Sequence, residues 1–368
     1  MSPDPSILRV EACGQERLAV QARLSSHCFR KPVDARGLEW RYERNPHGSS
    51  IRFVQALPDG EAVSGYACNP RRVLSQGDPA SAALMGETGD VMTHPDWRKL
   101  GLFSALDVAA RERSRELGWP AIFGLPNQRS AHIFLELGWK EVGRIAQWTH
   151  LLQGGLEIVA LRRAEGRLAA LCVPLDRWRA QRARERLRRA CGALRTEPLT
   201  SFPAEVRELS RRVGRDFAWM VERDADYLRW RFLESPSGLH RCLAIRDAAG
   251  AFLGYSVVQL PRSGERVGYL VDLLAADAAA RAAGLLGALE LLRSAGALVV
   301  RASAIRDSFW EEQLILAGFS TPSSALRRGR ELSVILFAHD PAHPLSRAWL
   351  DASRWYLTDG DRDDETMG

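Results

Sequence analysis

Four blocks of the sequence occur twice in the same order, and this internal repeat constrains the fold more than any other feature. The pairs are LEWRYERNPHG (38–48) with LRWRFLESPSG (228–238), IRFVQALPDGEAVSGYA (51–67) with HRCLAIRDAAGAFLGYS (240–256), RKLGLFSAL (98–106) with RAAGLLGAL (281–289), and FLELGW (134–139) with LILAGF (314–319). The spacing between partners shortens gradually along the chain, which is typical of a tandem duplication. We therefore predict two similar halves.

The repeat predicts an N-terminal domain at residues 1–158, a basic helical linker at 159–200 and a C-terminal domain at 201–368. The length of 368 residues fits two domains. The net charge of +6 is concentrated, because 11 arginines but only three acidic residues lie between positions 160 and 196. The simplest interpretation of this segment is a solvated connecting helix with one apolar face. Contact with a phosphate or an anionic membrane is the alternative.

Within each half, patterns typical of strands and of helices follow one another in the same order. A hairpin precedes a strand, a glycine turn and a long helix, and another strand and a short helix come next. This order predicts an α/β or α+β fold in which each half is a mixed sheet with flanking helices.

Composition excludes several classes of protein. No run of ~18 apolar residues is present, so no segment is expected to span a membrane. The N-terminal segment lacks the pattern of a secretory signal. The six cysteines are scattered without a CxxC pair, which argues against a zinc cluster and a disulfide framework and favours the cytoplasm. We expect no metal, and no nucleic-acid partner, because a recognisable nucleic-acid-binding motif is missing.

The segment WRKLGLF (97–103) joins an expected strand at 89–95 to an expected helix at 104–117. A helix that begins after a tight turn presents unpaired backbone N–H groups, and such groups bind phosphate. Gly101 allows unusual dihedral angles and the close approach of a ligand, while Arg98 and Lys99 add positive charge. Neither GxxxxGK[ST] nor GxGxxG is present, so the turn is not a Walker or a Rossmann loop.

The stretch VMTHPDWRKLGLF (91–103) resembles the acyl-CoA pyrophosphate loop of the GNAT superfamily of N-acyltransferases, which reads roughly V-x-P-x-[YW]-[RQ]-x-x-G-x-[GA]. The later LPNQRSAHIFLELGW (125–139) is similar to the block that closes that superfamily's domain. The segments WRYERNPHG, PNQRSAHIF and WYLTDGDRDD further resemble tandem-domain GNAT proteins of bacterial cell-surface polysaccharide pathways, which N-acylate nucleotide-linked amino sugars. The resemblance implies two tandem GNAT-like domains, with the acyl-CoA site in the first.

Coenzyme A, as acyl-CoA, is the co-substrate that this resemblance implies. The expected contacts come from the strand, the turn and the short helix: Met92, Thr93, Arg98, Lys99, Leu100, Gly101, Leu102, Phe103, Asn127 and Ser130. The backbone N–H of Met92 is the expected donor to the thioester oxygen. Asn127 and Ser130 also suit a cap of the short helix. The second copy keeps Arg281 and Gly284 but lacks the basic neighbour, so we expect a weaker or vestigial site there.

Acyl transfer to an amine needs a base that removes a proton from the amine. On the strand that leads into the turn the candidates are Asp90, Glu87 and His94, and Asp90 is preferred. Strand alternation places Glu87 and Asp90 on opposite faces unless a bulge intervenes. Each candidate also has an ordinary interpretation, as a solvent-facing or turn carboxylate or as a hydrogen-bonded loop histidine. Phe134 occupies the position at which the superfamily often has a general acid, and it has no proton to donate.

Five further residues are candidates for binding the amine substrate: Arg41, Tyr42, His132, Arg231 and Trp355. Arg41 and Arg231 are equivalent in the repeat and suit a nucleotide phosphate, although a helix that packs its aromatic face on the sheet is the simpler interpretation. His132 also suits packing or the surface. The acidic terminal segment is either a disordered tail or, through Trp355 and Asp359, part of the closure between domains.

These observations predict an acyl-CoA-dependent N-acyltransferase that acts on a primary amine, first of all that of a nucleotide-linked amino sugar, by direct attack on the thioester. The alternatives are acylation of a peptide or amino acid side chain, aminoacyl-tRNA-dependent peptidyl transfer, and binding of acyl-CoA without catalysis. The basic linker suits tRNA, whereas a retained pyrophosphate loop argues against it. A homodimer is compatible with the sequence.

Overall fold

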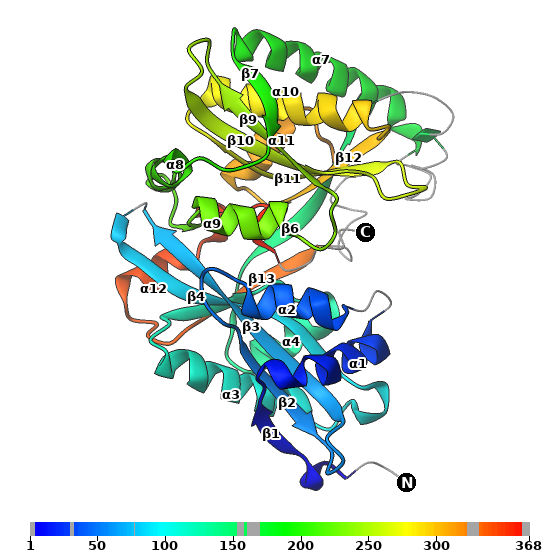
Figure 1. The fold of residues 1–368 in the computed structure, drawn as a ribbon, viewed down its shortest axis with the longest axis vertical. Helices are drawn as coiled ribbons and strands as arrows, with labels where there is room; N and C mark the ends of the chain where they lie inside the picture. Colours follow the sequence, from blue (N-terminus) through cyan, green and yellow to red (C-terminus); the bar gives the residue numbers. More distant parts are fainter. Residues whose placement is uncertain are drawn as a thin grey trace.

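The computed structural model describes residues 4–29, 33–76, 78–152, 158–159, 170–321 and 331–362, and in it the two halves of the chain lie end to end (Figure 1). Their strands form one continuous 14-stranded sheet, whose edge strands are β1 (Arg9–Ala12) and β7 (Arg195–Leu199). Parallel and antiparallel pairs are both present, and helices pack against the sheet in each half. The predicted fold class is confirmed.

The first half runs from β1 to β6 and carries the glycine turn. Its other strands are β2 (Ile51–Ala56), β3 (Ala62–Ser75), β4 (Asp78–Thr93), β5 (Ala121–Gly124) and β6 (Lys140–Leu151). Its helices are α1 (Leu18–Cys28), α2 (Ala35–Glu43), α3 (Leu102–Glu116) and α4 (Gln128–Glu136), with a 3-10 turn, η3 (Pro95–Trp97), after β4. Neighbouring strands from β1 to β4 are antiparallel, and β5 is parallel to β4.

The second half repeats this order with additions at both ends. Its other strands are β8 (Trp219–Val221), β9 (His240–Arg246), β10 (Phe252–Gln259), β11 (Val267–Ala275), β12 (Val299–Ile305), β13 (Leu332–Ala338) and β14 (Trp355–Tyr356). Its helical segments are α7 (Val173–Cys191), α8 (Glu205–Gly214), α9 (Ala225–Leu228) with the π-helical turn η4 (Arg229–Leu233), α10 (Ala278–Ser294), α11 (Phe309–Leu316), α12 (Pro344–Trp349) and the 3-10 turn η7 (Asp359–Asp361).

The halves are joined by an exchange of their last strands. β13, from the second half, lies between β5 and β6 of the first half and is antiparallel to both. β6, from the first half, pairs in turn with β12 of the second half over Ile145–Leu151. The neighbouring strands β6 and β13 therefore each complete the sheet of the other half, which makes the sheet continuous across the molecule.

The basic segment between the repeats is built into the second half. α7 packs against α10 and β6 with an inward face formed by Val173, Asp176, Ala180, Ala183, Leu187 and Cys191. β7, which follows α7, pairs with β9 and forms an edge of the sheet. The proposed boundaries at residues 158 and 200 stay a prediction, because the exchanged strands tie both halves together across them.

The repeated tryptophans meet at the junction of the halves. The indole N–H of Trp40 on α2 donates to the carbonyl oxygen of Trp230 at 3.1 Å, and that of Trp230 donates to the carbonyl oxygen of Trp40 at 2.9 Å. The two rings are stacked with centroids 4.8 Å apart. The sequence repeat thus corresponds to a reciprocal contact in space, as the packing interpretation of these aromatic residues predicts.

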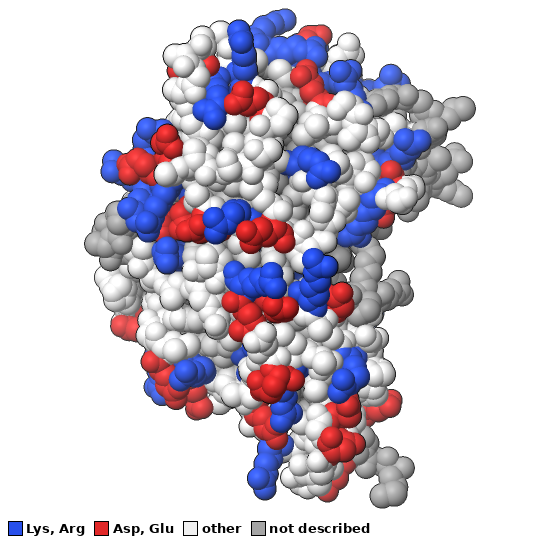
Figure 2. All heavy atoms as spheres, viewed as in Figure 1, with Lys and Arg blue, Asp and Glu red and all other residues white. Residues whose placement is uncertain are grey.

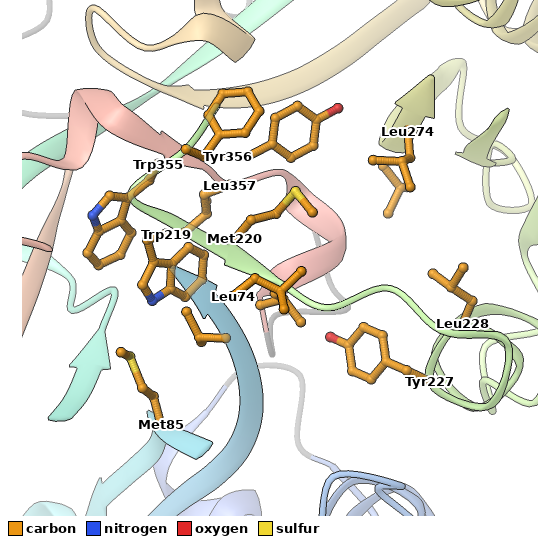
Figure 3. Packing of buried hydrophobic residues seen from close by; sticks show 14 of the residues in the cluster. Leu74, Met85, Trp219, Met220, Tyr227, Leu228, Leu274, Trp355, Tyr356 and Leu357 are labelled. Atoms are coloured by element: carbon orange, nitrogen blue, oxygen red, sulfur yellow. The ribbon is translucent and has the colours of Figure 1, made fainter. Parts of the chain in front are cut away.

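One apolar core extends across this junction (Figure 3). Trp219 on β8 stacks on Trp355 on β14 with centroids 4.5 Å apart, and Phe123 on β5 meets Trp219 edge-on at 5.0 Å. Trp219 and Trp355 are fully buried. Because aromatic rings from both halves are buried in one core, the stability of each half depends on the other. Without the second half, the rings of the first would be exposed to water, and the reverse is also true.

Two further properties concern the described part of the chain. None of its helices combines the length and the apolar character needed to cross a membrane. Among the same residues, no three metal-ligating side chains gather in a way that could hold an ion.

Candidate active site

The site begins where β4 separates from β5. The two strands pair in parallel at Gly86–Thr88 with Ile122–Gly124, and in the part of the chain described here that pairing ends at Thr88. β4 continues to Thr93 along β3 alone. The edge of β4 that faces away from β3 is therefore open from residue 89 onward. An open strand edge presents backbone N–H and C=O groups that an extended ligand can bind.

A bulge in β4 lies at this point. Met92 faces Gly65 and Gly89 faces Ala67, so two residues of β4, Asp90 and Val91, lie opposite one residue of β3. Asp90 has a φ of 47°, in the left-handed region that aspartate tolerates better than most residues. The extra residue shifts the alternation of side chains, so the bulge considered in the sequence is present and brings Glu87 and Asp90 to the same face as α2.

Asp90 meets two of the predicted substrate-binding residues. The guanidinium Nη1 of Arg41 donates to Oδ2 of Asp90 at 2.5 Å, and the hydroxyl of Tyr42 donates to the same oxygen at 2.7 Å. The Asp90 side chain keeps 13% of its surface exposed, whereas Tyr42 is fully buried. Arg41 and Tyr42 thus orient this carboxylate at the open edge of β4, while its Oδ1 atom has no hydrogen bond among the described residues.

Glu87 is held in a different environment on the same face. Its side chain is 3% exposed and pairs with the guanidinium of Arg71, itself 1% exposed, at 2.7 Å. The Arg71 guanidinium also lies 5.9 Å from the ring of Trp230. A buried ion pair of this kind is arranged for packing at the junction rather than for contact with an incoming ligand. Sequence reasoning missed Arg71, although an arginine within an apolar strand is itself a signal of a buried acidic partner.

His94 caps the turn that follows β4. Its Nδ1 atom accepts a hydrogen bond from the amide of Asp96 at 3.3 Å, at the start of η3. Its ring meets that of His27 edge-on, with centroids 4.9 Å apart. This geometry favours the interpretation of a hydrogen-bonded loop histidine, and a role as the base stays a prediction.

The glycine turn leaves the N-terminus of α3 open. Gly101 is the N-cap of α3 with a φ of 72°, Lys99 is also left-handed with a φ of 65°, and no side chain caps the helix. A Cβ built on Gly101 would meet no atom within 4 Å, so this residue borders open space. Arg98 donates to the carbonyl oxygen of Thr93, and both Arg98 and Lys99 are exposed. Unpaired N–H groups, the helix dipole and two cations together suit a pyrophosphate.

The remaining cofactor candidates surround this turn. Asn127 caps α4 by accepting hydrogen bonds from the amides of Arg129 and Ser130 at 2.9 and 3.2 Å, which confirms the predicted cap. The side chain of Leu102 is buried. That of Met92 packs between α1 and β2. The Met92 amide points toward β3, because the amide of His94, two residues further along, donates to the carbonyl oxygen of Val63 at 2.8 Å and Met92 itself pairs with Gly65. The expected donation from this amide to a thioester at the open edge is therefore not what the strand pairing favours.

The residues near the expected general acid are apolar. Phe134 is 2% exposed and lies edge-on to Phe103 at 4.8 Å and to Trp139 at 4.9 Å. His132, on the same helix, is exposed to solvent. Phe134 is therefore a core residue. Contacts of Asn127, Ser130 and His132 with ligands stay predictions.

The second half differs at the place that corresponds to the turn. α10 begins at Ala278, and its N-cap Asp277 accepts a hydrogen bond from the amide of Ala280 at 2.8 Å. Gly284, which the sequence aligns with Gly101, lies inside this helix, and a Cβ there would come within 2.8 Å of the Ile245 side chain. The expectation of a second glycine turn was therefore wrong. Gly284 instead permits α10 to pack closely on the sheet. The carboxylate of Asp277 occupies the helix end at which a phosphate would bind.

The C-terminal segment also fills the open edge of the second half. β11 and β12 pair over Val267–Tyr269, and beyond this point the amide of Ser303 on β12 donates to Oδ2 of Asp359 at 2.6 Å. Arg231 donates to the carbonyl oxygens of Gly360, at 2.9 Å, and of Arg362. The described part of the tail is thus ordered inside the second half, and Arg231 and the buried Trp355 both serve its packing. Their proposed role in binding a substrate stays a prediction.

Buried charges hold this tail. Arg223 pairs with Asp361 at 2.8 Å and with Asp272 at 3.3 Å, and all three side chains are at most 2% exposed. Burial raises the pKa of Asp361 above its usual range, and the neighbouring Arg223 opposes that rise. Burial likewise raises the pKa of Asp359, against the effect of Arg362. The network is a fixed structural element that takes the place of a ligand in the second half.

Residues 10–142 match the model of a family described as an acetyltransferase (GNAT) domain. The matched segment contains the open edge of β4, Asp90 and the glycine turn of α3. This segment, about a third of the chain, resembles GNAT acetyltransferase domains, and we refer to it as the GNAT domain. The match supports the prediction of an acyltransferase. No curated protein matches the chain.

Solved structures similar to the whole chain extend the comparison to the fold of both halves. A GCN5-related N-acetyltransferase from Anabaena variabilis has 13% identity and a TM-score of 0.60, with 90% of this chain and 73% of the other covered. A tandem GNAT protein from the clavulanic acid biosynthesis pathway has 14% identity and a TM-score of 0.53, with coverage of 91% and 100%. N-myristoyltransferase from Saccharomyces cerevisiae has 12% identity and a TM-score of 0.58, with coverage of 91% and 83%. These similarities cover 90% or more of this chain and concern its fold.

Proposed function

We propose that the GNAT domain binds acyl-CoA with its pyrophosphate at the N-terminus of α3 and its pantetheine along the open edge of β4. The observation that carries this proposal is the contrast between the two halves. In the first half the helix end is uncapped behind Gly101. In the second half Asp277 caps the helix and the C-terminal segment fills the edge. Of these two helix ends, that of α3 is the one left open by the described residues.

The proposed reaction is direct attack of a neutral primary amine on the thioester carbonyl. Asp90 accepts the proton of the amine, directly or through one water. What supports this role is its place on the stretch of β4 beyond the pairing with β5, where Arg41 and Tyr42 hold its Oδ2 atom and its side chain stays 13% exposed. A backbone N–H on the open edge of β4 stabilises the oxyanion of the tetrahedral intermediate. The intermediate collapses to the amide and the CoA thiolate, which takes its proton from solvent because Phe134 has none to give.

The amine acceptor that we propose is a nucleotide-linked amino sugar. What supports it is the resemblance of the repeated and terminal segments to tandem-domain sugar N-acyltransferases, together with the tandem arrangement of the fold. Acyl-CoA and the sugar nucleotide are both products of cytoplasmic metabolism. We accordingly propose the cytoplasm as the site of action, where cysteine thiols stay reduced.

Release of the CoA thiol tests this function. Native mass spectrometry of the purified protein identifies co-purified CoA species, and a thiol-release screen then pairs acyl-CoAs of increasing chain length with amino-sugar nucleotides, amino acids and peptides. We expect turnover with amino-sugar nucleotides. Turnover with peptides or amino acids alone would move the acceptor to the alternative class. CoA binding without turnover of any amine would identify a binding protein.

A further inference from the structure

The outward face of α7 combines exposed apolar and basic side chains. Its inward face packs on α10, and the opposite side carries Leu175 and Trp178, which are 47% and 52% exposed. The guanidinium of Arg182, one turn further, lies 4.5 Å from the ring of Trp178. α7 forms one end of the molecule, far from the half that carries the GNAT domain (Figure 1). A helix at such a position gains nothing for the fold from exposed leucine and tryptophan side chains.

The charges of this face are one-sided. The face carries five exposed arginines: Arg177, Arg179, Arg182, Arg186 and Arg189. In the part of the chain that the structure describes, none of them forms an ion pair with an acidic side chain. Glu185 is the acidic residue among them, and Arg188 pairs with Glu290 of α10 at 3.3 Å. Lys and Arg side chains accordingly gather at this end of the molecule (Figure 2).

We propose that the outward face of α7 docks onto the surface of an anionic lipid bilayer. Basic amphipathic helices lie flat in the headgroup region, where tryptophan and leucine enter the acyl boundary and arginines meet lipid phosphates. The arrangement on α7 fits this geometry, with the apolar pair in its N-terminal half and arginines toward its C-terminus. An RNA partner would use the arginines but would leave Leu175 without a role. The docked protein would present the GNAT domain to the aqueous phase.

Vesicle flotation of the full-length protein tests the proposal. We expect binding to vesicles of phosphatidylglycerol and phosphatidylcholine, weakening as salt is raised, and no binding to vesicles of phosphatidylcholine alone. The triple variant R182Q/R186Q/R189Q removes three charges near the surface and should weaken binding by about a hundredfold. The matched control R115Q/R212Q/R215Q removes three exposed arginines elsewhere and should bind as the parent does.

A second pair of variants separates insertion from charge attraction. L175S/W178S keeps every charge and should weaken binding by at least about tenfold, because two apolar side chains leave the bilayer. Circular dichroism and thiol release should be unchanged in all α7 variants, which lie outside the proposed active site. Equal binding to neutral and anionic vesicles, no binding to either, or salt-sensitive RNA binding that R182Q/R186Q/R189Q abolishes would overturn the proposal.

Discussion

At the scale of single residues, the two carboxylates of β4 have different tasks because their partners differ in exposure. The Asp90 side chain is 13% exposed, whereas that of Glu87 is 3% exposed and enclosed with Arg71. Asp90→Asn keeps the shape of the side chain and removes its basicity, so kcat/KM should fall by roughly 10²–10⁴-fold. Steady-state thiol release measures this. Near-parental activity of Asp90→Asn, with loss in His94→Gln, would pass the role of base to His94.

Glu87→Gln should act on stability instead of on the rate. It removes the negative charge that pairs with the buried Arg71 guanidinium at 2.7 Å, and breaking a buried pair costs about 3–5 kcal/mol. Urea unfolding of the variant measures the loss. A variant that unfolds like the parent but has lost its activity would show that Glu87, not Asp90, takes the proton.

Sequence reasoning reached Asp90 but not its environment. Alternation along β4 leaves the relative orientation of Glu87 and Asp90 undecided until the bulge is known, and a bulge depends on the register with β3 rather than on the local sequence. The alignment of Gly284 with Gly101 failed for a related reason. Gly101 adopts a left-handed φ at the start of α3, which a residue with a side chain would reach only with strain. Gly284 lies inside α10, and its missing side chain lets the helix pack closely against Ile245.

At the scale of elements, the exchanged strand β6 carries a buried histidine. Burial, with a smaller effect of Arg184, lowers the pKa of His150 to about 3 from its ordinary value of 6.5. The unfolded chain therefore binds a proton at a pH where the folded chain does not, so stability present above pH 6.5 is lost as the pH falls. This one group lowers the free energy of unfolding by about 2 kcal/mol between pH 8 and pH 5.

His150→Phe tests this account of β6. The difference in unfolding free energy between pH 8 and pH 5, measured in urea, should be smaller in the variant than in the parent by that amount. Phenylalanine keeps a ring against Phe319, which lies 5.2 Å from His150. The same pH dependence in variant and parent would mean that His150 does not control the acid stability of this strand.

At the scale of the whole molecule, the duplication visible in the sequence predicts two similar halves but not their exchange of strands. The terminal strands β6 and β13 have similar apolar patterns, so either can complete either sheet, and the geometry of the connections decides between them. The sequence likewise predicts a tail rich in acidic residues. That the tail lies buried on Arg223 and Arg231 depends on contacts between distant segments.

The exchange predicts that the halves do not fold separately. A fragment of residues 1–158 lacks β13, which leaves β5 and β6 without the strand that joins them. We expect this fragment to aggregate when expressed alone and to become monodisperse when co-expressed with residues 159–368, as measured by size-exclusion chromatography. A folded, monomeric fragment that binds acetyl-CoA would show that the exchange is not needed for the GNAT domain.

The central claim is that the open end of α3 binds the pyrophosphate of acyl-CoA, and one calorimetric comparison tests it most directly. Gly101 and Gly118 lie at the two ends of α3 with φ values of 72° and 73°, and a Cβ on either would meet no atom within 4 Å. Gly101→Glu and Gly118→Glu therefore carry the same backbone strain and the same charge. The account predicts that titration with acetyl-CoA gives parental affinity for Gly118→Glu and binding weaker by more than about a hundredfold, or roughly 2.7 kcal/mol, for Gly101→Glu. Equal affinities in the two variants would contradict it.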